Sequence, residues 1–266
     1  TGLRIMVKHL KGYTVMVSRP HDQAVSLCDR IEAEGGVAIL APMIAIRPIS
    51  DRERCGAVID RLDEYSIVVF ISRNAVAFGI EKVEQRKKNL NGATIYAVGV
   101  GTAVELKERG YPDVATPRRE FTSEGLLQLN GLQEDVIRDA KVLIIRGAGG
   151  REHLGKTLVG RGAEVDYCEV YERFVPDICI ADTLSAAGIS VPDIGILTSV
   201  EGVTNFVDKI DDEGLDLLFD MPLLVVGSRI ANEVANLGFT NPPIIVDNPS
   251  DDRIIDTLTR WVMDEI

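Results

Sequence analysis

The sequence predicts an α/β protein made of two similar lobes, each with a parallel sheet covered by helices on both faces. The first observation is a phrase that occurs twice, as AVGVGTAVELKERGY (Ala97–Tyr111) and as VVGSRIANEVANLGF (Val225–Phe239). Each copy has an apolar, strand-like run followed by a helix-like run. The second observation is that short β-rich runs alternate with amphipathic segments along the chain, which is typical of parallel sheets between two helical layers.

Other motifs repeat at nearly the same spacing. VMVSRP, which contains Arg19, resembles VLIIRG, which contains Arg146, and FISRNAV around Ser72 resembles ILTSVEGV around Ser199. Both pairs are 127 residues apart. A constant offset indicates a duplicated unit of about half the chain, which predicts a pair of lobes and excludes the many short repeats of a solenoid.

Hydrophobic periodicity predicts the elements of the first half in order. They are a strand at Val15–Ser18, a helix at Asp22–Glu34 ended by Gly35 and Gly36, an extended run at Ala38–Ile46, a strand at Val68–Ser72, a helix at Ala75–Val83, a strand at Thr94–Val98, a helix at Thr102–Arg109 and a short strand near Val114. The second half repeats this order and closes with a helix whose apolar face includes Ile254, Leu258 and Trp261. Five strands per lobe predict a flavodoxin-like arrangement.

Two long extended segments, Val37–Pro48 and Glu164–Phe174, occupy corresponding positions in the two halves. The second alternates with period two, which predicts one shared face for Val165, Tyr167, Glu169 and Tyr171. Both segments are followed by a change of composition, and we expect them to be linkers. Two linkers imply that the chain crosses between the lobes twice, so that a lobe can mix material from both halves.

Composition excludes several classes of protein. A net charge of −12 disfavours nucleic acid and anionic membranes as partners. The longest apolar runs, such as Ile67–Ile71, are far shorter than the roughly 18 to 20 residues of a membrane helix. The N-terminal residues show no apolar export signal, and we expect a cytoplasmic protein.

Metal and cofactor motifs are absent from the sequence. The four cysteines, Cys28, Cys55, Cys168 and Cys179, lie singly at wide intervals, which argues against a zinc site and a disulfide framework and favours buried small hydrophobes. GVGTAV lacks the third glycine of a dinucleotide fingerprint, and RGAGGRE lacks the Lys-Ser/Thr pair of a phosphate-binding loop. We therefore expect no cofactor and no metal.

Strand-to-helix turns are the candidate binding positions, because parallel sheets bind ligands at the carboxyl ends of their strands. Four such turns carry small, hydroxyl or basic residues: Ser72-Arg73-Asn74, Gly99-Val100-Gly101-Thr102, Thr198-Ser199-Val200-Glu201 and Gly227-Ser228-Arg229. Glycine allows a ligand to approach the backbone, and helix N-termini attract anions. The turns predict a composite anion-binding cleft, although each hydroxyl could instead be a simple N-cap.

Taken together, VSRP, FISRNAV, AVGVGTAVELKERGY, RGAGGREHLGKTLVGRGAEVDYCEVYER, LTSVEGVTNF and VGSRIANEVANLGF resemble the uroporphyrinogen-III synthase family over nearly the whole chain. The resemblance implies two α/β/α lobes joined by a two-stranded β linker. Carried over to this chain, one lobe is residues 1–46 with 175–266, and the other is residues 47–174.

The resemblance also implies a lyase of haem biosynthesis. Its reaction would cyclise hydroxymethylbilane, a linear tetrapyrrole, to uroporphyrinogen III, with loss of water and inversion of the last pyrrole ring. We expect a monomer that receives this small molecule from the preceding pathway enzyme, without nucleic acid, membrane or cofactor.

Tyr171 matches the tyrosine of the family's second linker and is the expected proton donor; its alternative is a partly buried strand tyrosine without a catalytic role. The expected substrate-binding residues are Arg19, Ser72, Arg73, Asn74, Gly101, Thr102, Arg146, Gly147, Ser199, Gly227, Ser228 and Arg229.

Two other functions compete with this one. A non-catalytic protein with two lobes that close on a small anion would share the turns, but it would usually carry an export signal or an appended segment. A nucleotide-sugar transferase would need a clearer phosphate-binding loop than GVGTAV.

Overall fold

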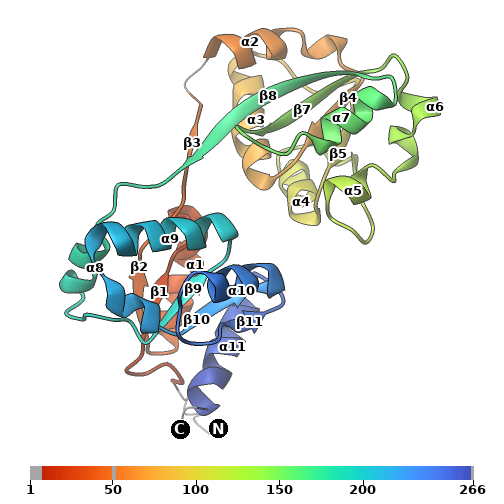
Figure 1. Cartoon of the computed structure of the whole chain (residues 1–266). Coiled ribbons are helices and arrows are strands. Elements are labelled where there is room, and N and C mark those ends of the chain that lie inside the picture. Colours follow the sequence, from red (N-terminus) through yellow and green to blue (C-terminus); the bar gives the residue numbers. More distant parts are fainter. Residues whose placement is uncertain (1–7, 50–51, 265–266) are drawn as a thin grey trace, which may run out of the picture. The chain divides into compact units, whose positions relative to one another are not determined.

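The computed structural model describes residues 8–49 and 52–264. By its internal contacts the chain divides into two compact units, which we name unit 1 (Thr1–Ala45 with Phe174–Ile266) and unit 2 (Ile46–Arg173). Each unit has one sheet with helices on both faces (Figure 1). No helix in the described part of the chain combines the length and the apolar character that a membrane span requires.

Unit 1 has a five-stranded parallel sheet in the order β11-β10-β9-β1-β2. Its strands are β1 (Thr14–Val17), β2 (Val37–Leu40), β9 (Ile194–Leu197), β10 (Leu223–Val226) and β11 (Ile244–Val246). Its helices are α1 (His21–Ala33), α8 (Ile180–Ala186), α9 (Val200–Glu213), the 3₁₀ helix η3 (Asp216–Asp220), α10 (Gly227–Asn236) and α11 (Asp251–Asp264). Counted along the chain within the unit, the strand order is 2-1-3-4-5, as the flavodoxin-like prediction requires.

Unit 2 has a six-stranded sheet in the order β3-β8-β7-β4-β5-β6. Its strands are β3 (Ala45–Pro48), β4 (Ile67–Phe70), β5 (Thr94–Ala97), β6 (Val114–Ala115), β7 (Lys141–Gly147) and β8 (Glu164–Phe174). Its helices are α2 (Arg52–Asp60), η1 (Leu62–Glu64), α3 (Arg73–Gln85), α4 (Val100–Glu108), α5 (Ser123–Leu126), η2 (Asn130–Leu132), α6 (Glu134–Ile137) and α7 (His153–Gly160). The strands from β4 to β8 pair in parallel.

The inner strands β1, β4, β9 and β10 are almost wholly apolar because both faces of each sheet are covered. In β1, Val15 and Val17 pack with α1 and α11, whereas Met16 packs with the helices of the opposite face. In β4, Val68 and Val69 divide in the same way between two cores. Burial on both faces explains why these strands read as continuous apolar runs.

The two halves of the sequence exchange their first strands. In the sheet of unit 2, β7 and β8 take the places that β1 and β2 take in unit 1, and β4, β5 and β6 correspond to β9, β10 and β11. Each unit therefore combines the strand–helix–strand opening of one half with the last three strands of the other. The repeated motifs of one half therefore lie in both units.

The segment from Val37 to Pro48, expected as one extended run, forms two strands in different sheets. β2 belongs to the sheet of unit 1, and β3 lies beside β8 in the sheet of unit 2. β3 and β8 are hydrogen-bonded neighbours, and the chain passes from one unit to the other at these two strands. They form the two-stranded β linker of the predicted fold.

The prediction that Tyr171 shares one face of β8 with Tyr167 is wrong. Arg146 of β7 pairs with Glu169, but the next residue, Gly147, pairs with Tyr171, so that Val170 is an extra residue in β8. Such a bulge reverses the alternation of side chains. Tyr171 consequently packs in the same core as Val170, on the face opposite to Tyr167.

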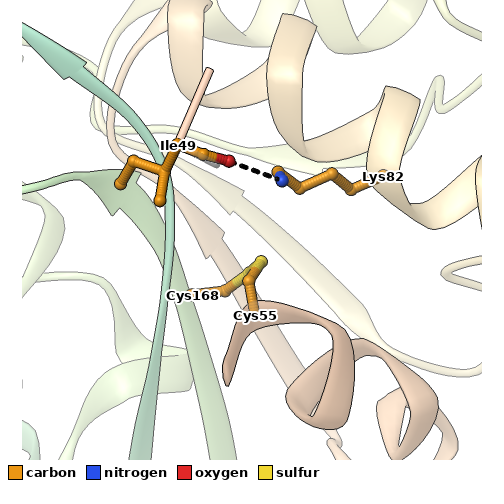
Figure 2. Close-up of a disulfide and its surroundings, with 4 residues drawn as sticks. All are labelled: Ile49, Cys55, Lys82 and Cys168. Atoms are coloured by element: carbon orange, nitrogen blue, oxygen red, sulfur yellow. Dashed lines mark hydrogen bonds between the residues drawn. A yellow bond between two sulfur atoms is a disulfide. The ribbon is translucent and has the colours of Figure 1, made fainter. Parts of the chain in front are cut away.

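The cysteine prediction is also wrong. Cys55 of α2 and Cys168 of β8 form a disulfide, with their Cα atoms 5.1 Å apart and a sequence separation of 113 (Figure 2). Beside it, Lys82 of α3 donates a hydrogen bond to the carbonyl oxygen of Ile49. Of the two free cysteines, Cys28 is partly exposed and Cys179 is exposed. Spacing in sequence could not show that the packing of α2 brings a second thiol to β8.

Candidate active site

Two predicted site residues meet at the carboxyl end of β4. Ser72 is the N-cap of α3, and its Oγ accepts a hydrogen bond from the amide of Ala75 at 3.0 Å. The same Oγ lies 3.1 Å from the hydroxyl oxygen of Tyr171. Tyr171 is only 2% exposed, whereas Ser72 is partly exposed. The structure thus joins the expected proton donor to one of the expected turn residues.

The position of the Tyr171 ring depends on the bulge in β8 and on Gly147. A Cβ atom at Gly147 would lie 2.6 Å from two ring carbons of Tyr171, closer than a side chain can tolerate. On its other side the ring contacts Phe78 of α3, with the ring centroids 5.9 Å apart. Gly147, predicted to bind substrate, therefore has a clear structural use, which is to let the tyrosine ring lie against the end of β7.

The neighbouring turn of unit 2 connects β5 to α4. A Cβ atom at Gly101 would lie 3.5 Å from Cδ of Arg73, so the arginine side chain of one turn extends over the glycine of the next. Arg73 is exposed, and Thr102 is 5% exposed. No described side chain caps α4. The turn therefore offers backbone amides to an anion, as a helix N-terminus can.

Arg146, near the end of β7, and Arg19, just after β1, occupy equivalent places in the two halves, and both are buried. Arg146 is 8% exposed; it forms an ion pair with Glu169 at 2.9 Å and lies 4.1 Å above the ring of Tyr167. Arg19 is 7% exposed and forms an ion pair with Asp251 at 2.7 Å. Each guanidinium also donates to a backbone carbonyl of a nearby loop. Both charges already have carboxylate partners within the protein.

The predicted turn residues of unit 1 lie at the carboxyl ends of β9 and β10. Ser199 is the N-cap of α9, and its Oγ accepts a hydrogen bond from the amide of Gly202 at 3.0 Å. Gly227 begins α10 with a φ of 77°, a conformation that favours glycine. Ser228 and Arg229 are exposed in the first turn of α10.

The structure therefore brings the predicted residues together as two sets, one in each unit. The set of unit 2 is Ser72, Arg73, Asn74, Gly101, Thr102, Arg146, Gly147 and Tyr171. The set of unit 1 is Arg19, Ser199, Gly227, Ser228 and Arg229.

Sequence reasoning missed a third group in unit 2, formed by Tyr96 and the residues that follow β6. Thr116, Arg118 and Arg119 line a cavity of about 690 Å³ with Tyr96. Its signal in the sequence is the adjacent arginines of TPRRE, directly after a short predicted strand. Within residues 8–49 and 52–264, no group of three or more His, Cys, Asp or Glu side chains is arranged to hold a metal ion.

Comparison with known proteins decides the family. The family model described as uroporphyrinogen-III synthase HemD matches residues 26–255. The chain belongs to the uroporphyrinogen-III synthase family. The members of this family are lyases of haem biosynthesis that act on a tetrapyrrole.

Two bacterial uroporphyrinogen-III synthases are similar along nearly their whole length. The protein of Salmonella typhimurium is 31% identical over 262 residues, a match that covers 92% of this chain and 99% of that protein. The protein of Escherichia coli is 30% identical over 247 residues, with the same coverage of 92% and 99%.

Solved uroporphyrinogen-III synthase structures share the fold. A mutant of the Thermus thermophilus enzyme matches with a TM-score of 0.63 at 16% identity, covering 96% of this chain and 100% of the other. The Helicobacter pylori enzyme matches with a TM-score of 0.58 at 14% identity, covering 94% and 99%. The α/β prediction with two parallel-sheet lobes is confirmed, and the alternative of a non-catalytic anion-binding protein is not supported.

Proposed function

We propose that this member of the uroporphyrinogen-III synthase family closes hydroxymethylbilane to uroporphyrinogen III, with loss of water and inversion of the last pyrrole ring. The observation that carries the proposal is the match to the Salmonella typhimurium synthase over 99% of that protein. We further propose that the family's two lobes are residues 1–46 with 175–266 and residues 47–174, and that a monomer takes its substrate from the enzyme of the preceding step.

The pair of hydroxyl groups at Ser72 and Tyr171 is the proposed proton donor. Tyr171 is buried and Ser72 is partly exposed, so we assign Ser72 to the side of the leaving hydroxyl and Tyr171 to the supply of the proton behind it. As the carbon–oxygen bond breaks, the proton moves onto the departing oxygen and water leaves. The pyrrole carbon that forms the closing bond releases a proton in turn, which restores the pair.

The N-terminus of α3 supports this transfer. Ser72 Oγ accepts from the amide of Ala75, so the partial positive charge of the helix end lies beside the oxygens that lose a proton. The helix end would thus stabilise the pair of hydroxyls while a proton leaves it.

The turns of both units are proposed to bind the eight carboxylates of the substrate. The protein has a net charge of −12, so the carboxylates must be held by directed local donors and not by the overall field. The uncapped start of α4 and the exposed side chains of Arg73, Ser228 and Arg229 provide such donors. Arg19 and Arg146 would act through the loops that they fix, because both are already paired.

The deciding experiment is incubation with hydroxymethylbilane, followed by oxidation and separation of porphyrin isomers I and III. Spontaneous closure gives isomer I, because it involves no ring inversion. We expect isomer III as the main product. A folded preparation that gives only isomer I would contradict the proposed function.

A further inference from the structure

The cavity that follows β6 is not used by the residues assigned above. It lies within unit 2 and has a volume of about 690 Å³. The polar side chains that line it are Tyr96 of β5, Thr116, Arg118, Arg119, Glu120 and Gln128.

Strand pairing places the loop that lines this cavity beside the turn between β5 and α4. β6 pairs in parallel with β5, with Ala115 opposite Tyr96, so the chain from Thr116 onward leaves the sheet at the edge where β5 ends. Further along this loop, Cβ of Phe121 lies 4.0 Å from the position of a Cβ atom on Gly99. The loop that carries the arginines therefore lies against the turn between β5 and α4.

Two hydroxyl groups at the cavity have no hydrogen-bond partner among the described residues. Tyr96 is 5% exposed, and its hydroxyl oxygen lies 2.1 Å from where a Cβ atom of Gly131 would be, in space that only glycine leaves open. The Oγ1 of Thr116 is buried and unpaired. Buried polar groups are almost always hydrogen-bonded, so the unpaired Oγ1 of Thr116 indicates a missing partner. Burial also raises the pKa of Tyr96, which keeps the hydroxyl protonated and able to donate.

The charge at the cavity is positive. Arg118 and Arg119 are exposed, and neither forms an ion pair with any residue in the described ranges, in contrast to the buried and paired Arg146. The opposing carboxylate in the lining is Glu120, which leaves an excess of one positive charge. In a protein with a net charge of −12, two unpaired guanidinium groups beside two unpaired hydroxyls form a local site for an anion.

We propose that this cavity binds one carboxylate of the tetrapyrrole substrate. Arg118 and Arg119 form charge-assisted hydrogen bonds with it, and the hydroxyls of Tyr96 and Thr116 donate to it. The planar fork of a guanidinium matches a carboxylate in two parallel hydrogen bonds. The inference rests on the proposed function and extends it, because it assigns a substrate-binding role to a loop that the repeated turns do not include.

The test is steady-state kinetics of the Arg118→Gln, Arg119→Gln double variant and of Tyr96→Phe with hydroxymethylbilane. Because the bonds hold a group remote from the reacting carbon, we expect a rise in KM and little change in kcat. The rise should be about tenfold or more for the double variant, which corresponds to about 1.4 kcal/mol of binding free energy. It should shrink at high ionic strength, since the interaction is partly between charges.

The matched control is Lys87→Gln with Lys107→Gln. Both lysines are exposed residues of unit 2 and form no ion pair within the described chain, so this change removes the same total charge away from the cavity. We expect the KM of the control to stay within about twofold of the wild type, since neither lysine lines the cavity.

A second measurement is equilibrium binding of uroporphyrin III, the stable oxidised form of the product, by fluorescence titration. Weaker binding by the arginine variant, with wild-type binding by the lysine control, would support the inference. Unchanged KM and unchanged binding in both cavity variants would overturn it, provided that the wild type yields isomer III. If the wild type itself yields only isomer I, the proposed function fails, and with it the inference that rests on it.

Discussion

At the carboxyl end of β4, two hydroxyl groups share one hydrogen bond, and only one of the two side chains is accessible to solvent. Tyr171 is enclosed by Phe78, by Gly147 and by the core of unit 2, while Ser72 lies at the start of a helix. The tyrosine hydroxyl can therefore be removed without removing the ring that fills the core. A variant can thus separate chemistry from packing at this position.

Replacement of Tyr171 by phenylalanine is expected to lower kcat by roughly a hundredfold to ten-thousandfold, the usual contribution of a general acid. Replacement of Thr102, Ser199 or Ser228 by alanine should have a smaller effect. In the proposed function each would remove one of many hydrogen bonds to carboxylates, worth about 1.5 to 3 kcal/mol at most and partly replaced by water. The measurement is the rate of isomer III formation, with circular dichroism to verify folding.

Tyr65→Phe is the matched control for loss of a tyrosine hydroxyl. Tyr65 donates to Asp166 at 2.6 Å, and it precedes β4, so it lies at the edge of the sheet opposite to Ser72. Burial and the carboxylate of Asp166 raise the pKa of Tyr65, and the hydroxyl stays protonated at neutral pH. This variant should keep its rate. Near-wild-type turnover in a folded Tyr171→Phe protein would show that the tyrosine only supports the site.

Gly147→Ala tests the same hydroxyl pair without removing either hydroxyl. The new Cβ atom would lie 2.6 Å from the Tyr171 ring, so the ring must shift and its bond to Ser72 must lengthen or break. We expect kcat to fall at least tenfold, since small displacements of catalytic groups are costly. In Gly160→Ala, by contrast, the Cβ atom meets nothing within 4 Å, and the rate should not change. Equal rates for the two variants would argue against a role for the ring position.

At the scale of elements, Glu213 at the end of α9 holds the start of α8. Its carboxylate accepts hydrogen bonds from the amides of Ile180 at 3.0 Å and Ala181 at 2.8 Å. Burial opposes ionisation of Glu213, but these backbone hydrogen bonds outweigh it, and the pKa is lowered from its ordinary value. A carboxyl group whose pKa is lower in the folded state stabilises the fold above its unfolded pKa, and this stabilisation is lost as pH falls through the folded pKa.

Glu213→Gln should therefore lower the free energy of unfolding at pH 7 by about 1 kcal/mol, after allowance for partial exposure. The difference from the wild type should diminish as the pH falls below the ordinary carboxyl pKa of 4.5. Urea denaturation at pH 7 and at about pH 3.5 measures both values. The control is Asp212→Asn, since Asp212 is an exposed neighbour with no hydrogen bond or ion pair within the described residues. A difference that does not depend on pH would contradict the assignment.

Most elements follow from the sequence because their signals are local. The apolar run before Ser72 and the N-cap of α3 fix the end of β4, and the equivalent run and cap at Ser199 fix β9. The bulge at Val170 and the disulfide of Cys168 had no such signal, because both depend on a neighbouring element that only tertiary packing supplies.

The candidate site shows the same limit. The sequence located the turns, and the structure joins Tyr171 to Ser72. The sequence could not show that Asp251 pairs with Arg19 and Glu169 with Arg146, since these partners come from helix α11 and strand β8. A basic residue in a repeated motif can bind substrate or fix a loop, and the repeat alone does not distinguish the two.

At the scale of the whole molecule, a repeated half of the sequence does not correspond to a compact unit, because the halves exchange their first strands. Unit 2 is one continuous stretch, Ile46–Arg173, whose sheet is covered on both faces by its own helices. We expect a fragment of residues 46–173 to unfold cooperatively on its own. A fragment of residues 1–133 is the first half of the chain. It should not fold cooperatively, because β1 and β4 belong to different sheets. Thermal melts and dispersed amide resonances distinguish folded from unfolded fragments.

The opposite result would be that the fragment of residues 1–133 folds and the fragment of residues 46–173 does not. It would mean that the strands of one half can form a sheet among themselves and that the exchange is not needed for stability. Neither fragment is expected to form isomer III, because residues 46–173 lack the set of unit 1, and residues 1–133 lack members of both sets, Tyr171 included.

The same exchange determines the order in which the parts can form on the ribosome. β1 lies between β2 and β9 in its sheet, and its outer helix layer includes α11, the last helix of the described chain. The ribosome adds about 5–20 residues per second, so roughly 10–45 seconds pass between the synthesis of β2 and that of α11. During this interval unit 2 can complete its sheet, while α1 alone covers apolar side chains of the first two strands, and the positions of β9, α9, α10 and α11 are still empty. The newly made N-terminal segment is thus a natural client for a chaperone, and a translational pause after residue 173 would prolong its exposure.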